Sequence, residues 1–217
     1  MGRKKQRKPQ TIPPPVDKVG LTLAFAGAVQ VLRRQWDSLY FLFLANKDRR
    51  RALADFAPNL SDAAALAFTV MVYMDIAKLH DPVISMNQPN KRNLVLRRVI
   101  DEIAPPAGTA ERVAIELEFA KIQPTVEKIK GWRNLVGAHQ DLLTSLAVIN
   151  RVLDPTKPHP MPYIPLKELE DAVTSIVAIN DAVVAFRAPT LPWYEADIIS
   201  RDVERFIALF TAANPPS

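Results

Sequence analysis

The strongest constraint on the fold is the spacing of apolar residues, which recur at intervals of three and four along most of the chain. Between Asp17 and Asn46 one such stripe is continuous. This period places apolar side chains on a single face of a helix. The segment is therefore expected to form one long amphipathic helix, whose apolar face consists of Leu21, Phe25, Ala28, Val29, Leu32, Trp36, Leu39, Tyr40 and Phe43.

The next helices are delimited by capping residues and prolines. A short charged helix is expected at 48–56. Ser61 is expected to cap a helix over 62–79, which is apolar on nearly every side and should be central to the core, with Met71 and Met74 buried. Pro82 should end that helix, because the residue before a proline is pushed out of the α region. A polar loop is expected from there to Asn90.

The second half of the chain continues the helical period. Thr109 is placed to cap a helix that runs to about Gln123, and Pro124 suits the first turn of a further helix. Five prolines between 154 and 165 indicate a linker or surface loop. No strand pattern of comparable strength and no solenoid repeat is present, so the sequence predicts an all-α bundle. The other expected helices cover 91–104, 166–186 and 194–212.

The positive charge of the chain is confined to its start. Of the 28 Lys and Arg, five lie among the first eight residues with no acid between them, which leaves 23 basic against 23 acidic residues in the rest. This distribution argues against a fold whose whole surface binds phosphate, so any nucleic-acid contact must come from the start or from a local site. Residues 1–16 are expected to form a disordered basic, proline-rich arm, which is either a solubilising tail or a nucleic-acid contact. Residues 17–217 are expected to be a single all-α domain.

Composition excludes several classes of site. The absence of cysteine rules out disulfides and thiol chemistry, and three scattered histidines with six glycines make a zinc site or a glycine-rich phosphate loop improbable. No metal or cofactor is therefore expected. Proline replaces the apolar run that a signal peptide requires, and the longest apolar stretches fall short of about 20 residues. A cytoplasmic protein without a membrane partner is expected.

Polar side chains gather in one helical stretch, between Lys128 and Asp141. Arg133 and His139 are six positions apart and lie roughly 120° from each other on a straight helix. They could flank one groove if Gly131 and Gly137 allow a local distortion, or if a second protomer supplies the opposite wall. The alternative is a surface arginine and a histidine at a helix contact.

The order of residues in this stretch resembles the HEPN superfamily, and more narrowly its abortive-infection U-type family. The matching positions are Arg133, Asn134, Ala138, His139 and Asp141. The Leu79–Pro82 segment, followed by Asn93–Arg98, is similar to a second conserved segment of that family, and Ile176–Val183 with Asn180 is similar to its closing helix. The resemblance covers roughly residues 35–187.

The resemblance implies a metal-independent RNA endonuclease that acts as a homodimer in abortive infection, phage defence or a toxin system, with a possible antitoxin or regulatory protein as partner. His139 would be the general acid or base, Arg133 the phosphate clamp and Asn134 an orienting group, whereas Asp141 could equally support the site or have a structural role. The alternative is a non-catalytic module that binds a nucleotide, RNA or a protein.

Four cations near these segments are candidate RNA contacts: Arg97, Arg98, Lys128 and Lys130. They could also simply be the solvated faces of helices. His80 and Asp81 look like a charge pair, but an aspartate before a proline at a helix end more often belongs to a turn or cap.

Overall fold

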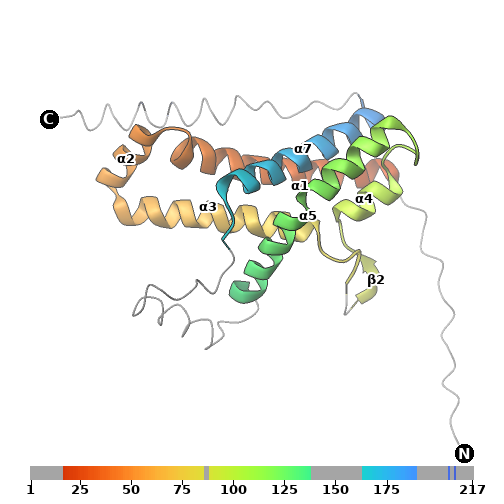
Figure 1. Ribbon diagram of the computed structural model, residues 1–217, viewed down its shortest axis with the longest axis horizontal. Helices are drawn as coiled ribbons and strands as arrows, with labels where there is room; N and C mark the ends of the chain where they lie inside the picture. Colours follow the sequence, from red (N-terminus) through yellow and green to blue (C-terminus); the bar gives the residue numbers. More distant parts are fainter. Residues whose placement is uncertain (1–16, 86–87, 138–162, 190–204, 206–207, 209–217) are drawn as a thin grey trace, which may run out of the picture.

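The computed structural model describes residues 17–85, 88–137, 163–189, 205 and 208. These residues form an all-α helical bundle, as predicted, with one small β-hairpin. Helices α1, α3 and α7 run roughly along the longest axis of the molecule, and α5 crosses them obliquely (Figure 1). The elements are α1 (Lys18–Leu39), η1 (Tyr40–Leu44), α2 (Lys47–Phe56), α3 (Pro58–Leu79), β1 (Ile84–Ser85), β2 (Gln88–Arg92), α4 (Leu96–Glu102), α5 (Ala110–Gly137) and α7 (Leu166–Arg187).

Helix α1 confirms the prediction for the first stripe. Its N-cap residue, Asp17, accepts a hydrogen bond from the Gly20 backbone nitrogen at 3.0 Å. The helix ends in the π-helical turn η1, after which the Asn46 side chain caps α2. Its buried apolar residues face α3 and α7 and form the centre of the core: Leu21, Phe25, Val29, Leu32, Trp36 and Leu39.

Helix α3 differs from the prediction at its start and in its burial. It begins at Pro58 in the first turn, where the missing N–H of proline loses nothing, so Ser61 lies inside the helix and does not cap it. The side chains of Leu66 and Met71 are 63% and 45% exposed, so the expectation that Met71 is buried is wrong. The helix packs against α1, α2 and α5 on its other faces, and its fully buried residues, such as Val72 and Ile76, lie in its second half.

Among the described residues, α3 is also the one helix whose length and composition would allow it to cross a membrane.

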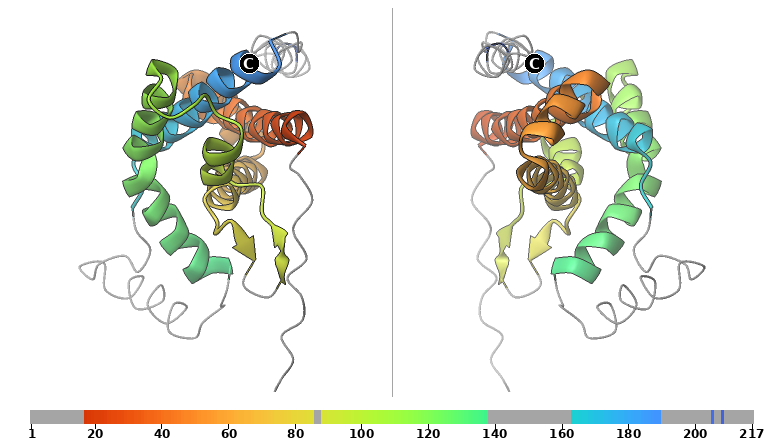
Figure 2. Two further views of the ribbon diagram at one scale, coloured as in Figure 1. Left: turned by 90° about the vertical axis from the view of Figure 1, so that its right-hand side faces the viewer. Right: turned by 90° about the vertical axis from the view of Figure 1, so that its left-hand side faces the viewer.

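The segment after α3 forms a hairpin in place of the predicted loop and early helix. β1 pairs with β2 antiparallel, with Ile84 opposite Arg92 and Ser85 opposite Gln88, and the hairpin projects from the bundle (Figures 1 and 2). Asn93 closes it, because its backbone nitrogen donates to the Val83 carbonyl at 2.8 Å. The helix predicted over 91–104 therefore begins only at Leu96.

Helix α5 is a single element where two were predicted. Thr109 caps it as expected, with Oγ1 accepting from the Arg112 backbone nitrogen at 3.2 Å. Pro124 lies inside the helix and not at the start of a new one. A proline in a helix interior removes one backbone hydrogen bond. The helix continues because Ile122, Val126 and Ile129 are buried on both sides of that position. α7 matches its prediction, whereas the arm 1–16 and most of 194–212 lie outside the described residues.

The two halves of α3 provide a matched pair of substitutions. Ile76 is fully buried, so we expect Ile76→Ala to lower the free energy of unfolding by about 2–5 kcal/mol through the lost burial and the cavity it leaves. Leu66 is 63% exposed on the same helix, and Leu66→Ala should change it by no more than about 0.5 kcal/mol. Urea unfolding followed by circular dichroism measures both. Equal effects would contradict the burial of α3 described here.

Candidate functional site

The structure brings together two sequence segments that are 52 residues apart. Nη1 of Arg133, on the penultimate turn of α5, donates to Oδ1 of Asp81 at 2.5 Å. The two side chains are 25% and 27% exposed, so the ion pair lies at a partly covered edge of the bundle. Charge-assisted hydrogen bonds of this kind are stronger than neutral ones. Asp81 thus has a turn position in the backbone, as predicted, and also a side-chain partner that the sequence did not reveal.

Asp81 is held from both sides along the chain. Its backbone nitrogen donates to the Lys78 carbonyl at 3.3 Å, which continues the last turn of α3. On the other side, Nδ2 of Asn93 donates to the Pro82 carbonyl at 2.8 Å and ties the base of the hairpin to the same turn. The position of the Asp81 carboxylate is therefore set by a helix end and a hairpin base. Both belong to the second family-like segment, which is Leu79–Pro82 followed by Asn93–Arg98.

The turn that carries Arg133 is anchored by its neighbour. Trp132 packs edge-to-face against Tyr73 of α3, with ring centroids 5.2 Å apart. Such aromatic pairs stabilise a contact beyond the area they bury. Burial raises the pKa of the Tyr73 hydroxyl above its ordinary value, so this tyrosine remains neutral at physiological pH. The α3–α5 crossing thus has an aromatic contact beside the ion pair.

His80 lies directly before Asp81 and is mostly buried. Its Nδ1 is 2.9 Å from the Ile76 carbonyl, and because a carbonyl can only accept, Nδ1 carries the proton. The ring stacks on Phe119 of α5 at 5.8 Å. Nε2 is buried and has no hydrogen-bond partner among the described residues. Burial lowers the pKa of His80 to about 4, despite the opposing hydrogen bond to Ile76, so the ring is neutral at pH 7.

The candidate RNA contacts on α5 are both paired with acids. Nζ of Lys128 lies 2.7 Å from Oε2 of Glu168 on α7, and Nζ of Lys130 lies 3.0 Å from Oε1 of Glu127. The Lys128–Glu168 pair joins α5 to α7, which gives it a structural role. Lys130 is one turn before Arg133 and belongs to the same stretch of helix, so it remains the nearest described lysine to the site along α5.

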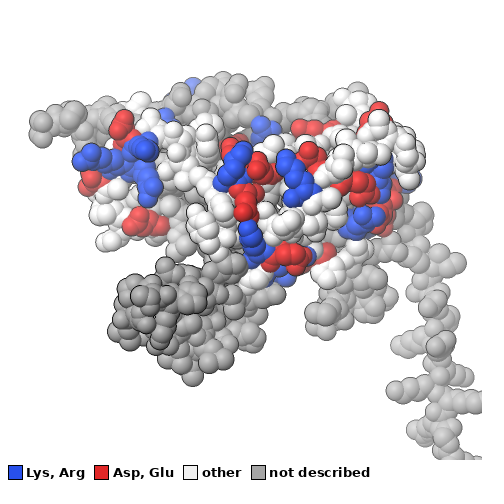
Figure 3. Space-filling view, in the orientation of Figure 1, with Lys and Arg blue, Asp and Glu red and all other residues white. Residues whose placement is uncertain are grey.

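The candidate contacts on α4 are likewise paired with acids. Arg97 pairs with Asp101 at 2.7 Å and with Glu116 at 3.3 Å, and Arg98 pairs with Glu102 at 3.1 Å. The guanidinium of Arg97 also lies over the Phe119 ring, 6.0 Å from its centroid, on the helix that carries Arg133. Each of the four predicted cations is thus paired with a carboxylate of the described residues. On the face shown in Figure 3, basic and acidic side chains are interspersed.

The remaining predicted site residues are less fully placed. Asn134 follows Arg133 in α5, and His139 and Asp141 lie outside the described residues. The ion pair of Arg133 is thus the part of the predicted constellation that can be described.

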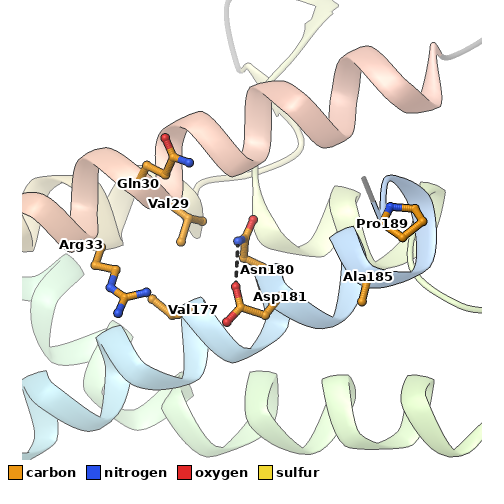
Figure 4. Close-up of a pocket in the computed structure, with 8 residues that line it drawn as sticks. All are labelled: Val29, Gln30, Arg33, Val177, Asn180, Asp181, Ala185 and Pro189. Atoms are coloured by element: carbon orange, nitrogen blue, oxygen red, sulfur yellow. Dashed lines mark hydrogen bonds between the residues drawn. The ribbon is translucent and has the colours of Figure 1, made fainter. Parts of the chain in front are cut away.

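Asn180 belongs to the third family-like segment, Ile176–Val183, and lines a separate cavity. This cavity of about 440 Å³ lies between α1 and α7, and its wall includes Arg33 and Asp181 (Figure 4). Asn180 is only 3% exposed. Its Nδ2 donates to Oδ1 of Asp181 at 3.2 Å, while its own Oδ1 has no partner among the described residues. The sequence pointed to Asn180 only through the resemblance of its segment to the closing helix of the HEPN-like family, and it gave no sign of the cavity.

Comparison of the chain with models of protein families, with curated proteins and with solved structures found no significant match.

The buried His80 predicts a specific pH dependence of stability. Its pKa of about 4 in the folded chain lies below the ordinary value of 6.5, so protonation favours the unfolded state. The contribution of neutral His80 to the free energy of unfolding is fully present above about pH 6.5. It falls by about 3 kcal/mol as the pH is lowered to 4. Lys130, Glu127 and Asp81 are the charged groups nearest to the ring, and Lys130 adds to the shift.

Urea unfolding at pH 7, 5.5 and 4 compares the wild type with His80→Gln, which cannot titrate. We expect the wild type to lose about 3 kcal/mol more than the variant across this range. Parallel pH profiles for the two proteins would show that His80 is not held neutral by burial.

Proposed function

We propose that this protein is a HEPN-type, metal-independent RNA endonuclease that acts as a homodimer in the cytoplasm, in an abortive-infection, phage-defence or toxin system. The observation that carries the proposal is the Asp81–Arg133 ion pair. Two segments that resemble the same family, and that lie far apart in the sequence, meet at the residue expected to bind phosphate. A chance resemblance in either segment would not require this contact.

The proposed chemistry needs one base, one acid and one cation. The base removes the proton from a ribose 2′-hydroxyl, whose oxygen attacks the adjacent phosphorus. The bond from phosphorus to the 5′-oxygen breaks, and the acid protonates that oxygen, leaving a 2′,3′-cyclic phosphate. Histidine suits both proton transfers because it titrates near neutral pH, and arginine suits the charge that grows on the phosphate oxygens.

In this scheme Arg133 binds the scissile phosphate and His139 transfers protons, with Asn134 as an orienting group and Asp141 in a supporting role. A single chain has one His139, so a second protomer would supply the second histidine. His80 does not fill that role in the conformation seen here, because its Nε2 is shielded from solvent. The dimer is therefore part of the proposal.

The alternative function is a non-catalytic module that binds a nucleotide, RNA or a protein partner. Two observations favour it. The four cations predicted to bind RNA are paired with carboxylates of the same chain, which weakens the case for an extended RNA surface. The cavity beside Asn180 also has the size of a small-molecule site.

RNA cleavage in EDTA tests the proposed enzyme. We expect the wild type to cut single-stranded RNA without a metal ion and to leave 2′,3′-cyclic phosphate ends, and we expect His139→Ala and Arg133→Ala each to lower the rate by at least about 100-fold. Gel analysis of end-labelled RNA, with phosphatase treatment to identify the ends, gives both readouts.

The matched control removes an arginine elsewhere. Arg51 on α2 has a side chain that is 84% exposed, so Arg51→Ala should cleave at the wild-type rate. Cleavage that survives His139→Ala would overturn the proposed mechanism. A wild type that binds RNA but never cleaves it would favour the non-catalytic module.

A further inference from the structure

We propose that Asp81 is a positioning residue for Arg133: it engages one nitrogen of the guanidinium group and thereby presents the other two to a phosphate. This inference rests on the proposed function, and it assigns a role to a residue outside the Arg133–His139 stretch. It also gives a reason for the second family-like segment, whose Asp-Pro turn and Asn93 would together hold the carboxylate in place.

The contact leaves most of the guanidinium available. An arginine has five N–H donors in a planar fork. Within the described part of the chain, the Arg133 side chain makes one hydrogen bond, from Nη1 to Asp81, and this bond uses a single donor. The side chain is 25% exposed, so its other donors can be reached from solvent.

The carboxylate is rigid enough to orient its partner. An exposed salt bridge contributes little, because both long side chains must be ordered to form it. Here the acid is short, is only 27% exposed, and is fixed between the last turn of α3 and the hairpin base closed by Asn93. On the other side, the Trp132–Tyr73 contact fixes the turn of α5. Ordering the guanidinium before the phosphate arrives reduces the entropy that must be lost on binding.

The same carboxylate also opposes the substrate. A phosphate bound to the remaining donors would lie near the negative charge of Asp81, and like charges at short range repel. Asp81 should therefore improve the alignment of Arg133 in the transition state without strengthening the binding of RNA in the ground state. Removing Asp81 should therefore lower kcat without raising KM for RNA. A loss of folded protein also lowers the apparent kcat, so the folded fraction of each variant is measured beside the kinetics.

Steady-state cleavage by Asp81→Ala and Asp81→Asn tests this role. We expect Asp81→Ala to lower kcat by about tenfold or more, while KM for RNA stays the same or falls. Asp81→Asn should retain more activity than Asp81→Ala, because its Oδ1 can still accept from Nη1. Asp75→Ala is the matched control: Asp75 is on α3, the helix that Asp81 follows, and it pairs with Lys78 at 2.9 Å, so its removal should leave kcat unchanged.

Two steady-state results would overturn the positioning role. One is a kcat for Asp81→Ala equal to that of the wild type and of Asp75→Ala. The other is a rise in KM with kcat unchanged, which would mean that Asp81 supports only RNA binding. Thermal unfolding of each variant identifies a loss of activity that comes from unfolding alone, and such a loss, restored on cooling to a temperature where the variant is fully folded, would equally count against the role.

A second readout separates this inference from the proposed function. In ¹⁵N NMR spectra, the side-chain nitrogens of Arg133, identified by their loss in Arg133→Lys, should show slowed rotation of the guanidinium group in the wild type and averaged signals in Asp81→Ala. Averaged signals already in the wild type would overturn the positioning role whether or not RNA is cleaved. Slowed rotation in a protein that does not cleave RNA would instead overturn the proposed enzyme and, with it, the catalytic part of the role.

Discussion

The ion pair between Asp81 and Arg133 joins the end of α3 to the end of α5, and the arrangement of the candidate site depends on it. Both partners are placed by elements that fold for independent reasons. Asp81 follows a helix whose second half is buried in the core, and Arg133 follows Trp132, which packs against that same half. The hairpin closed by Asn93 completes the setting. Apolar packing between α3 and α5 thus holds the two distant segments within hydrogen-bonding distance of each other.

The distribution of charge narrows what such a site can bind. Outside the first eight residues the chain has equal numbers of acids and bases. The four cations predicted to contact RNA are paired with carboxylates on the same or a neighbouring helix. Pairing of this kind favours recognition of one phosphate at one place over a continuous track along the nucleic-acid backbone. Arg133 fits that picture, because its pairing with Asp81 uses one donor and leaves the rest of its fork available.

Much of the fold could be predicted from the sequence, because the residues that are buried recur with the helical period. The stripe of α1, the short α2, the Thr109 cap and the extent of α7 are all confirmed. The errors came where tertiary contacts override a local signal. Pro124 continues a helix that packing holds together, and the residues before Leu96 pair as a strand. Met71 is exposed because no described helix packs over that side of α3. The Asp81–Arg133 contact could not be predicted, because no local pattern specifies which acid meets which arginine across 52 residues.

The central claim is that this site uses the 2′-hydroxyl of RNA as the nucleophile, and a single change in the substrate tests it most directly. An RNA oligonucleotide with one 2′-deoxynucleotide at the mapped cleavage position would be incubated with the wild-type protein in EDTA. We expect cleavage to stop at that position and to continue in the all-ribose control. Cleavage of the substituted position at the same rate as the control would contradict it.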